Sequence, residues 1–188
     1  MKVPVIPEDP THDQHILKPV VQRIFRDLGR PKTRVEVLQD PCIRGLEQAL
    51  SRQTIDEILA RYFAADLFLL IVDRDGQEGR QVAVDERVRQ AADRGRALIG
   101  CLAIEEVEVW ALALHRSEFT DWSEVRREHN PKEVYFQPLA KAKGWLESKG
   151  RGRAEAMKAL AGNWRALKQR CPEVQQLQDD VAAWLAGR

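Results

Sequence analysis

The chain has 188 residues, the size of one domain with a substantial hydrophobic core, and 30 Lys and Arg almost balance 29 Asp and Glu. The net charge of +1 therefore identifies no partner, and no apolar stretch has the ~20 residues of a membrane span or the form of a signal peptide. Three scattered cysteines without a CxxC pair argue against a zinc site or a disulfide framework, so we expect a cytoplasmic protein with reduced thiols.

The first part of the chain alternates strand-like and helix-like segments. Extended apolar stretches predict strands over residues 2–7, 34–38, 67–72 and 97–103. Apolar residues at helical spacing predict helices over residues 12–28, 54–63 and 82–94. The prolines of the first strand favour a place near a sheet edge, because proline removes a ladder hydrogen bond. The order of elements predicts an α/β fold with a mostly parallel sheet and helices on both faces.

Helical patterns dominate the rest of the chain. Helices are expected over residues 105–115, 123–128, 134–149, 153–167 and 173–185. No long linker precedes them. We therefore expect an α/β domain over residues 1–115 and a helical C-terminal extension, residues 116–188, that packs on it.

Two carboxylates mark the end of the third predicted strand. Six apolar residues, Leu67 to Val72, run directly into Asp73 and Asp75. Residues two apart in an extended segment point the same way, so both side chains can converge on one hard cation. The alternative is a polar strand end before a Gly turn. Because ligands of open α/β sheets lie at the carboxyl ends of the strands, we expect Asp73 and Asp75 to bind Mg²⁺ or Mn²⁺.

Acidic residues also follow the first and fourth predicted strands. Glu8 and Asp9 come after the first, and Glu105 and Glu106, with Glu108 close by, come after the fourth. Such residues can also be helix caps or can favour a helix dipole without any other role. Gathered at one sheet edge, however, these carboxylates would repel each other until a cation neutralised them. We therefore include Glu8, Asp9, Glu105 and Glu106 among the candidate metal ligands.

Three stretches in this order resemble a known fold. They are residues 5–9, VIPED, residues 71–76, IVDRDG, and residues 104–110, IEEVEVW. They resemble the TOPRIM domain, the metal-binding fold of topoisomerases, primases and OLD-type nucleases, and most closely small bacterial TOPRIM-like proteins. The similarity covers about residues 3–115.

The resemblance implies roles for particular residues. Glu8 would be the acid/base or metal-ligating glutamate, and Asp73 and Asp75 would be metal ligands; together these three are the expected catalytic residues. The family commonly has glycine where this chain has Asp9, which leaves Asp9 as a further candidate ligand.

A second resemblance competes with the first. Asp73-Arg74-Asp75-Gly76 is also similar to the nucleophile motif of haloacid-dehalogenase-type phosphatases. That family opens its domain with this strand, whereas two predicted strands precede it here. A phosphate-cradling P-loop motif is absent, which argues against that type of nucleotide hydrolysis.

A basic segment lies in the helical extension. Between Lys141 and Arg170 nine Lys and Arg residues stand against two Glu residues, and Trp145 and Trp164 are interleaved with them. This pattern is typical either of a solvated helix face or of a surface that contacts a phosphate backbone. Lys149, Arg151 and Arg153, in a glycine-rich stretch, are the candidate nucleic-acid contacts.

Two histidines, His12 and His15, lie three residues apart near Glu8 and either assist metal binding or proton transfer or are surface or cap residues. The pattern as a whole predicts a Mg²⁺-dependent, nuclease-like phosphodiesterase acting on nucleic acid. The alternatives are a non-catalytic TOPRIM-like subunit of a defence or toxin-type system that binds nucleic acid or protein, and a haloacid-dehalogenase-like phosphatase. A partner protein or a homo-oligomer is compatible with either.

Overall fold

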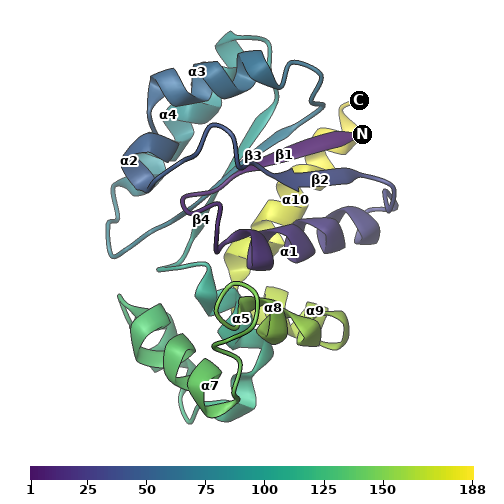
Figure 1. Cartoon of the computed structure of the whole chain (residues 1–188). Coiled ribbons are helices and arrows are strands. Elements are labelled where there is room, and N and C mark those ends of the chain that lie inside the picture. Colours follow the sequence, from purple (N-terminus) through teal and green to yellow (C-terminus); the bar gives the residue numbers. More distant parts are fainter.

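The computed structural model describes residues 1–188 and is built around a four-stranded sheet (Figure 1). Its strands are β1 (Lys2–Ile6), β2 (Arg34–Val37), β3 (Phe68–Asp73) and β4 (Leu98–Ala103). They lie in the order β2-β1-β3-β4, and every neighbouring pair is parallel. The α/β fold predicted from the sequence is therefore confirmed, and the sheet is parallel throughout.

The expected edge position of β1 is wrong, because β1 pairs with β2 on one side and with β3 on the other. Its backbone ladder with β3 is confined to Val5 and Ile6, which lie beyond Pro4. Pro4 has no N–H to donate, and at its position β1 and β3 form no backbone ladder that would need this donor. A proline can occupy an inner strand under this condition.

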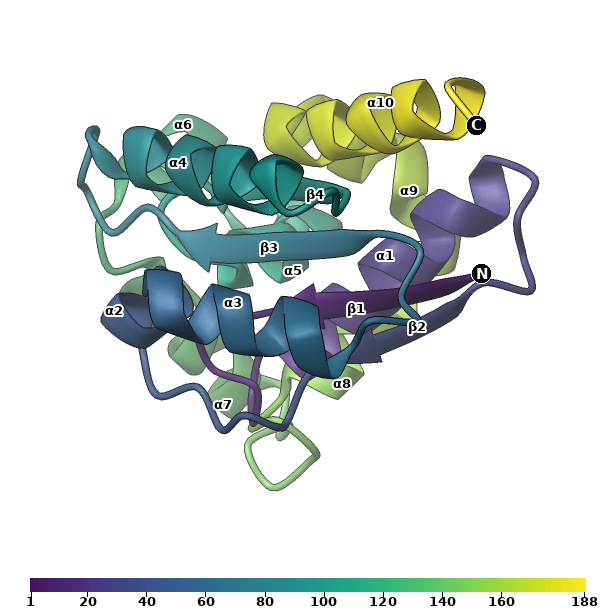
Figure 2. The ribbon, with the colours of Figure 1, turned by 90° about the horizontal axis from the view of Figure 1, so that it is seen from above.

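Helices cover both faces of the sheet, as predicted (Figures 1 and 2). On one face lie α2 (Leu46–Ala49), α3 (Arg52–Arg61) and α4 (Arg80–Asp93), which form a core of 13 buried residues with the sheet. On the other face lie α1 (Gln14–Asp27) and the C-terminal helices, around a core of 35 buried residues. Because both faces are covered, β3 is buried from Phe68 to Val72, as its continuous apolar run indicated.

The remaining helices follow β4. They are α5 (Glu108–Leu114), η1 (Arg116–Glu118), α6 (Trp122–Arg127), the π-helical turn η2 (Lys132–Phe136), α7 (Gln137–Ala142), α8 (Arg153–Ala156), η3 (Met157–Ala159), α9 (Leu160–Arg170) and α10 (Pro172–Ala186). The larger core joins strand residues to Trp110 of α5 and to side chains of α9 and α10. The helical extension thus shares the core of the sheet. None of the helices has the length and apolar character needed to cross a membrane.

Two predicted helices have different bounds in the structure. The helix expected over residues 105–115 begins only at Glu108, because Glu105 has a left-handed φ of +29°. The helix expected over residues 134–149 ends at Ala142, where Gly144 takes a φ of +70° and Trp145 N–H donates to the carbonyl of Ala140. Residues around Lys149 consequently lie in a loop.

Gly100 allows α4 to pack closely on β4. A Cβ there would lie 2.3 Å from Cγ1 of Val84 and 3.2 Å from Cγ2 of Val88. We expect Gly100→Ala to lower the free energy of unfolding by about 1–3 kcal/mol through overpacking, measured by urea denaturation. The added cost should be smaller in a Val84→Ala background.

Gly162 in α9 is a matched control, since a Cβ there meets no atom within 4 Å. Gly162→Ala should raise the free energy of unfolding by about 0.5–1 kcal/mol, because alanine favours the helix. A Gly100→Ala protein as stable as the wild type would contradict the close packing of α4.

Candidate metal centre

An acidic cleft lies at the edge of the sheet where the parallel strands end. Its volume is about 530 Å³, and its wall joins this edge to the helical extension. Seven carboxylates line it: Glu8, Asp9, Asp13, Asp73, Asp75, Glu106 and Glu108. Three cationic side chains line it as well: Arg44, Lys132 and Arg153. The cleft occupies the position that ligands take in open α/β sheets.

Three of these carboxylates form a possible metal site. Asp73, Asp75 and Glu106 each offer an oxygen, and these oxygens all lie within 4.8 Å of one another. Asp73 ends β3, Asp75 lies in the following turn, and Glu106 follows β4. Carboxylate oxygens are the ligands that hard divalent cations prefer, so these residues suit such a cation.

Backbone groups hold two of the three carboxylates in place. Val107 N–H donates to Oδ1 of Asp73 at 2.9 Å, and Lys132 N–H donates to Oε2 of Glu106 at 2.7 Å. Burial raises the pKa of Asp73 well above its usual value, and the nearby carboxylates, Glu108 first, add to this rise. Burial and Glu108 likewise raise the pKa of Glu106 to about 7. Without a cation, both side chains therefore retain protons above the usual carboxyl range.

Arg80 partly neutralises the third carboxylate. Its Nη1 lies 2.7 Å from Oδ2 of Asp75 and donates to the backbone carbonyl of Asp73 at 2.5 Å. The Arg80 side chain is buried, whereas that of Asp75 is 41% exposed. Asp75 therefore turns one oxygen towards a fixed guanidinium and remains accessible from the cleft.

Glu8 lines the cleft but is not part of this triad. Its Oε2 is buried and has no hydrogen-bond partner in the protein. Burial and the charge of Asp75 raise its pKa above the usual value. A buried carboxylate oxygen without a partner needs a proton or a cation, so Glu8 adds a second feature that fits a bound cation.

Asp9 also lines the cleft, but its oxygens are already engaged. Oδ1 accepts hydrogen bonds from the N–H groups of Thr11 and His12, and Oδ2 lies 2.8 Å from Nδ1 of His12. Burial opposes ionisation, yet these hydrogen bonds prevail and hold the pKa of Asp9 below its usual value. The structure thus places Asp9 as an organiser of the turn before α1 rather than within the triad.

Glu105, expected among the metal ligands, does not line the cleft. Its buried carboxylate forms an ion pair with Arg74 and accepts the N–H of Gly76 at 2.6 Å. Its backbone carbonyl accepts the N–H groups of Arg74 and Asp75. Burial raises the pKa of Glu105, but the bonds from Arg74 and Gly76 outweigh it and leave the pKa lowered. Glu105 therefore shapes the turn that presents Asp75.

The basic stretch is only partly exposed. Arg153 begins α8, is buried at 6% exposure, and forms an ion pair with the buried Glu108. Arg153, a candidate nucleic-acid contact, is therefore already paired inside the protein. Lys149 and Arg151 are exposed, and Arg151 lines a hollow of about 160 Å³ that adjoins the cleft and is also lined by His12 and Lys132.

His15 lies outside both hollows, and burial and the nearby charge of Arg153 lower its pKa.

Sequence analysis did not identify Asp13, Arg44 or Lys132. Asp13 accepts the N–H of Asp9, and burial and Glu108 raise its pKa to about 8. Arg44 is exposed and its side chain forms no ion pair. Burial lowers the pKa of Lys132, but the nearby charges, those of Glu108 and Glu106 first, raise it more, so the net shift is upward. These residues belong to loops and turns whose spacing carries no metal or phosphate signature.

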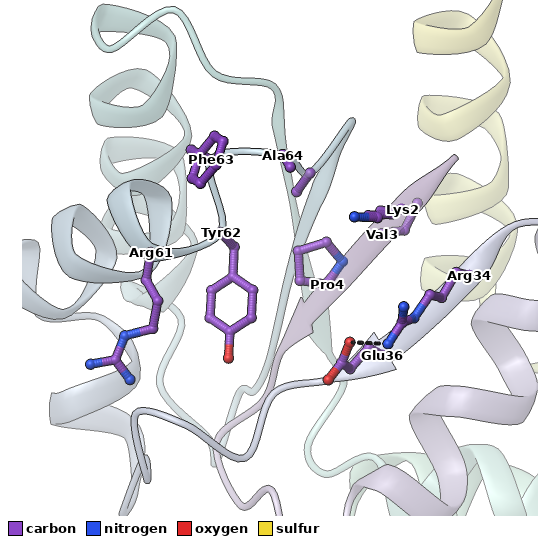
Figure 3. Close-up of a pocket in the computed structure, with 10 residues that line it drawn as sticks. Lys2, Val3, Pro4, Arg34, Glu36, Arg61, Tyr62, Phe63 and Ala64 are labelled. Atoms are coloured by element: carbon purple, nitrogen blue, oxygen red, sulfur yellow. Dashed lines mark ion pairs between the residues drawn. The ribbon is translucent and has the colours of Figure 1, made fainter.

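A smaller hollow lies at the opposite end of the strands (Figure 3). It has a volume of about 230 Å³ and lies beside the starts of β1 and β2, next to Tyr62 and the exposed Phe63. Two of its ionic groups, Arg34 and Glu36, are 3.8 Å apart and pair with each other, and Lys2 and Arg61 line it as well. No cluster of carboxylates is present there, so the acidic cleft is the better candidate site.

Comparison with models of protein families, with curated proteins and with solved structures finds no match for this chain. The assignment of a function consequently rests on the geometry of the cleft.

The raised pKa values predict a pH-dependent stability. Between pH 3.8 and about 8 an unfolded Asp13 loses its proton while the folded one keeps it, so the folded state binds more protons and stability falls as pH rises. Glu106 acts in the same direction between 4.5 and about 7. His15 acts in the opposite direction up to about one pH unit above 6.5, because its lowered pKa leaves it neutral in the folded state while the unfolded side chain is still partly protonated.

In chelator, thermal unfolding should therefore show stability falling between pH 6.5 and 8, by up to about 1.4 kcal/mol per pH unit for Asp13. Asp13→Asn should flatten this dependence, whereas Asp179→Asn, at an exposed position of α10, should not. Stability that rises over this range in the wild type would contradict the protonated state of the cluster.

Proposed function

We propose that this protein is a Mg²⁺- or Mn²⁺-dependent phosphoryl-transfer enzyme that hydrolyses phosphodiester bonds of nucleic acid. The observation that carries the proposal is the convergence of Asp73, Asp75 and Glu106 within 4.8 Å in an open cleft at the carboxyl edge of a parallel sheet. A cation held by these residues would polarise a phosphoryl oxygen and activate water. The all-oxygen ligand set favours Mg²⁺ or Mn²⁺ over softer metals.

The surrounding residues have roles that follow from their positions. Asp73, Asp75 and Glu106 would hold the cation, and Glu8 would exchange a proton at its unpartnered Oε2. Lys132, with its raised pKa, remains cationic at the wall of the cleft and attracts a phosphate. These roles agree with those that the TOPRIM resemblance implies for Glu8, Asp73 and Asp75. Of the two further candidates after β4, Glu106 lines the cleft and Glu105 does not.

The nucleic-acid strand would follow the cationic rim of the cleft. Arg44 lies on one wall, and Arg151 lines the adjoining hollow; both are exposed and neither forms an ion pair. Such residues can bind phosphates without first breaking an internal contact. Lys149 is also exposed, but it lines neither hollow. Arg44 and Arg151 are therefore the first residues to test, with Lys149 as a peripheral comparison.

A non-catalytic binding subunit is the second candidate function. It is favoured by the positive side chains of Arg80, Lys132 and Arg153. These already neutralise part of the carboxylate cluster, so the cluster does not require a metal ion. In that case the rim would bind nucleic acid and the acidic cluster would have only a structural role. The haloacid-dehalogenase alternative would instead require Asp73 to form a phosphoaspartate, which mass spectrometry of acid-quenched protein would detect.

Metal binding can be tested by thermal unfolding. Mg²⁺ or Mn²⁺ should raise the melting temperature, since a ligand at 100 times its Kd stabilises the native state by about 2.7 kcal/mol. Glu106→Gln and Asp75→Asn should abolish most of this increment while the metal-free proteins stay folded. Asp179→Asn, at an exposed position of α10 outside the cleft, should retain the full metal increment. An unchanged response in Glu106→Gln would remove this residue as a ligand.

Different variants should lose nucleic-acid cleavage and nucleic-acid binding. With labelled single-stranded DNA and RNA, Asp75→Asn should lose metal-dependent cleavage by at least 100-fold and still bind. Arg44→Ala combined with Arg151→Ala should weaken binding and reduce its salt dependence, because fewer counterions are released. Lys149→Ala should have a smaller effect. Wild-type protein that binds but never cleaves with either metal would favour the binding subunit.

A further inference from the structure

Strand β4 is an edge of the sheet, and half of its backbone groups have no partner strand. Phe68 N–H donates to the carbonyl of Ala97, and Arg74 N–H donates to that of Ala103, so the odd-numbered positions of this strand face β3. Backbone polar groups alternate sides along a strand. Those of Leu98, Gly100 and Leu102 therefore face the open edge, where a further strand can pair with them.

A groove of about 850 Å³ runs along this open edge between α4 and α10, the two helices that flank β4 in Figure 2. Its floor includes Leu98, Ile99, Leu102 and Leu177. An apolar floor beside unpaired backbone groups suits an extended peptide, whose alternate side chains would lie on either face of β4.

The rim of the groove has an excess of negative charge. Glu78, Asp85 and Asp180 line it, and none of the three forms an ion pair. Its one arginine, Arg74, is already paired with Glu105, and its fourth acidic residue, Glu173, is paired with Arg126. The charged side chains that line the groove without an ion-pair partner are therefore all negative.

We propose that the β4 edge binds an extended, cationic peptide segment of another protein as a fifth strand, with lysine or arginine side chains facing Glu78, Asp85 and Asp180. Charge distinguishes this occupant from the alternatives. A second copy pairing through β4 would bring the same carboxylates of both copies together, and nucleic acid would be repelled by them. The groove is separate from the acidic cleft, so the proposal does not depend on metal binding or cleavage.

Hydrogen exchange tests the strand pairing residue by residue. The probe is a peptide of alternating valine and lysine residues, and exchange is measured by NMR on the full chain. In the free protein, the amides of Leu98, Gly100 and Leu102 should exchange quickly and those of Ile99 and Cys101 slowly. Saturating peptide should slow exchange at the first three at least tenfold. No added protection at these three amides would overturn the proposal.

Fluorescence anisotropy with the labelled peptide tests the charge. Asp85→Lys combined with Asp180→Lys should raise the Kd at least tenfold. The matched control combines Asp93→Lys with Asp179→Lys, which changes the net charge equally at exposed positions outside the groove. An equal loss in the control pair, or equal binding of a peptide with glutamate in place of lysine, would overturn the assignment.

Sedimentation measures the competing occupant. The protein without peptide should sediment as a monomer, and Asp75→Asn should bind the peptide as the wild type does, since Asp75 lies outside the groove. If the protein is instead a dimer and this dimer does not bind the peptide, a second copy covers β4 and the proposal is overturned.

Discussion

The mutual repulsion of carboxylates gathered at one sheet edge is the constraint on which this structure depends. Parallel strands bring their ends together, so acidic residues after β1, β3 and β4 meet in one cleft. Repulsion of this kind is relieved by protons, by fixed cations or by a bound metal. The chain uses the first two: several carboxyl pKa values are raised, and the buried guanidinium groups of Arg80 and Arg153 pair with Asp75 and Glu108.

The helical extension supplies much of this compensation. Arg153 begins α8, and Lys132 begins the π-helical turn whose backbone binds Glu106. The cleft is thus assembled from two distant parts of the chain, joined by a core that contains strand residues and Trp110 together with residues of α9 and α10. A substitution that loosens this shared core would widen the spacing between cations and carboxylates even without touching either.

Much of the fold follows from local patterns, because the run from Leu67 to Val72 is long, apolar and ends in charge. Other features depend on contacts that spacing cannot reveal. Adjacent glutamates have equal standing in the sequence, yet the left-handed backbone of Glu105 sends its side chain to Arg74 and leaves Glu106 in the cleft. Pro4 suggested an edge strand, but the short ladder between β1 and β3 tolerates its missing donor. Arg153, in a glycine-rich basic stretch, was a candidate nucleic-acid contact, but its side chain pairs with the buried Glu108.

The unusual protonation of the cleft has a consequence for how a cation would enter it. Near neutral pH, part of the carboxyl cluster holds protons that a cation must displace, so occupation is an exchange of ions rather than simple addition. Each cation that entered would release protons to the solvent, and the measured heat of binding would include the ionisation heat of the buffer. Acidification would favour protons over a cation in the cleft, so occupancy would depend on the local proton concentration as well as on metal supply.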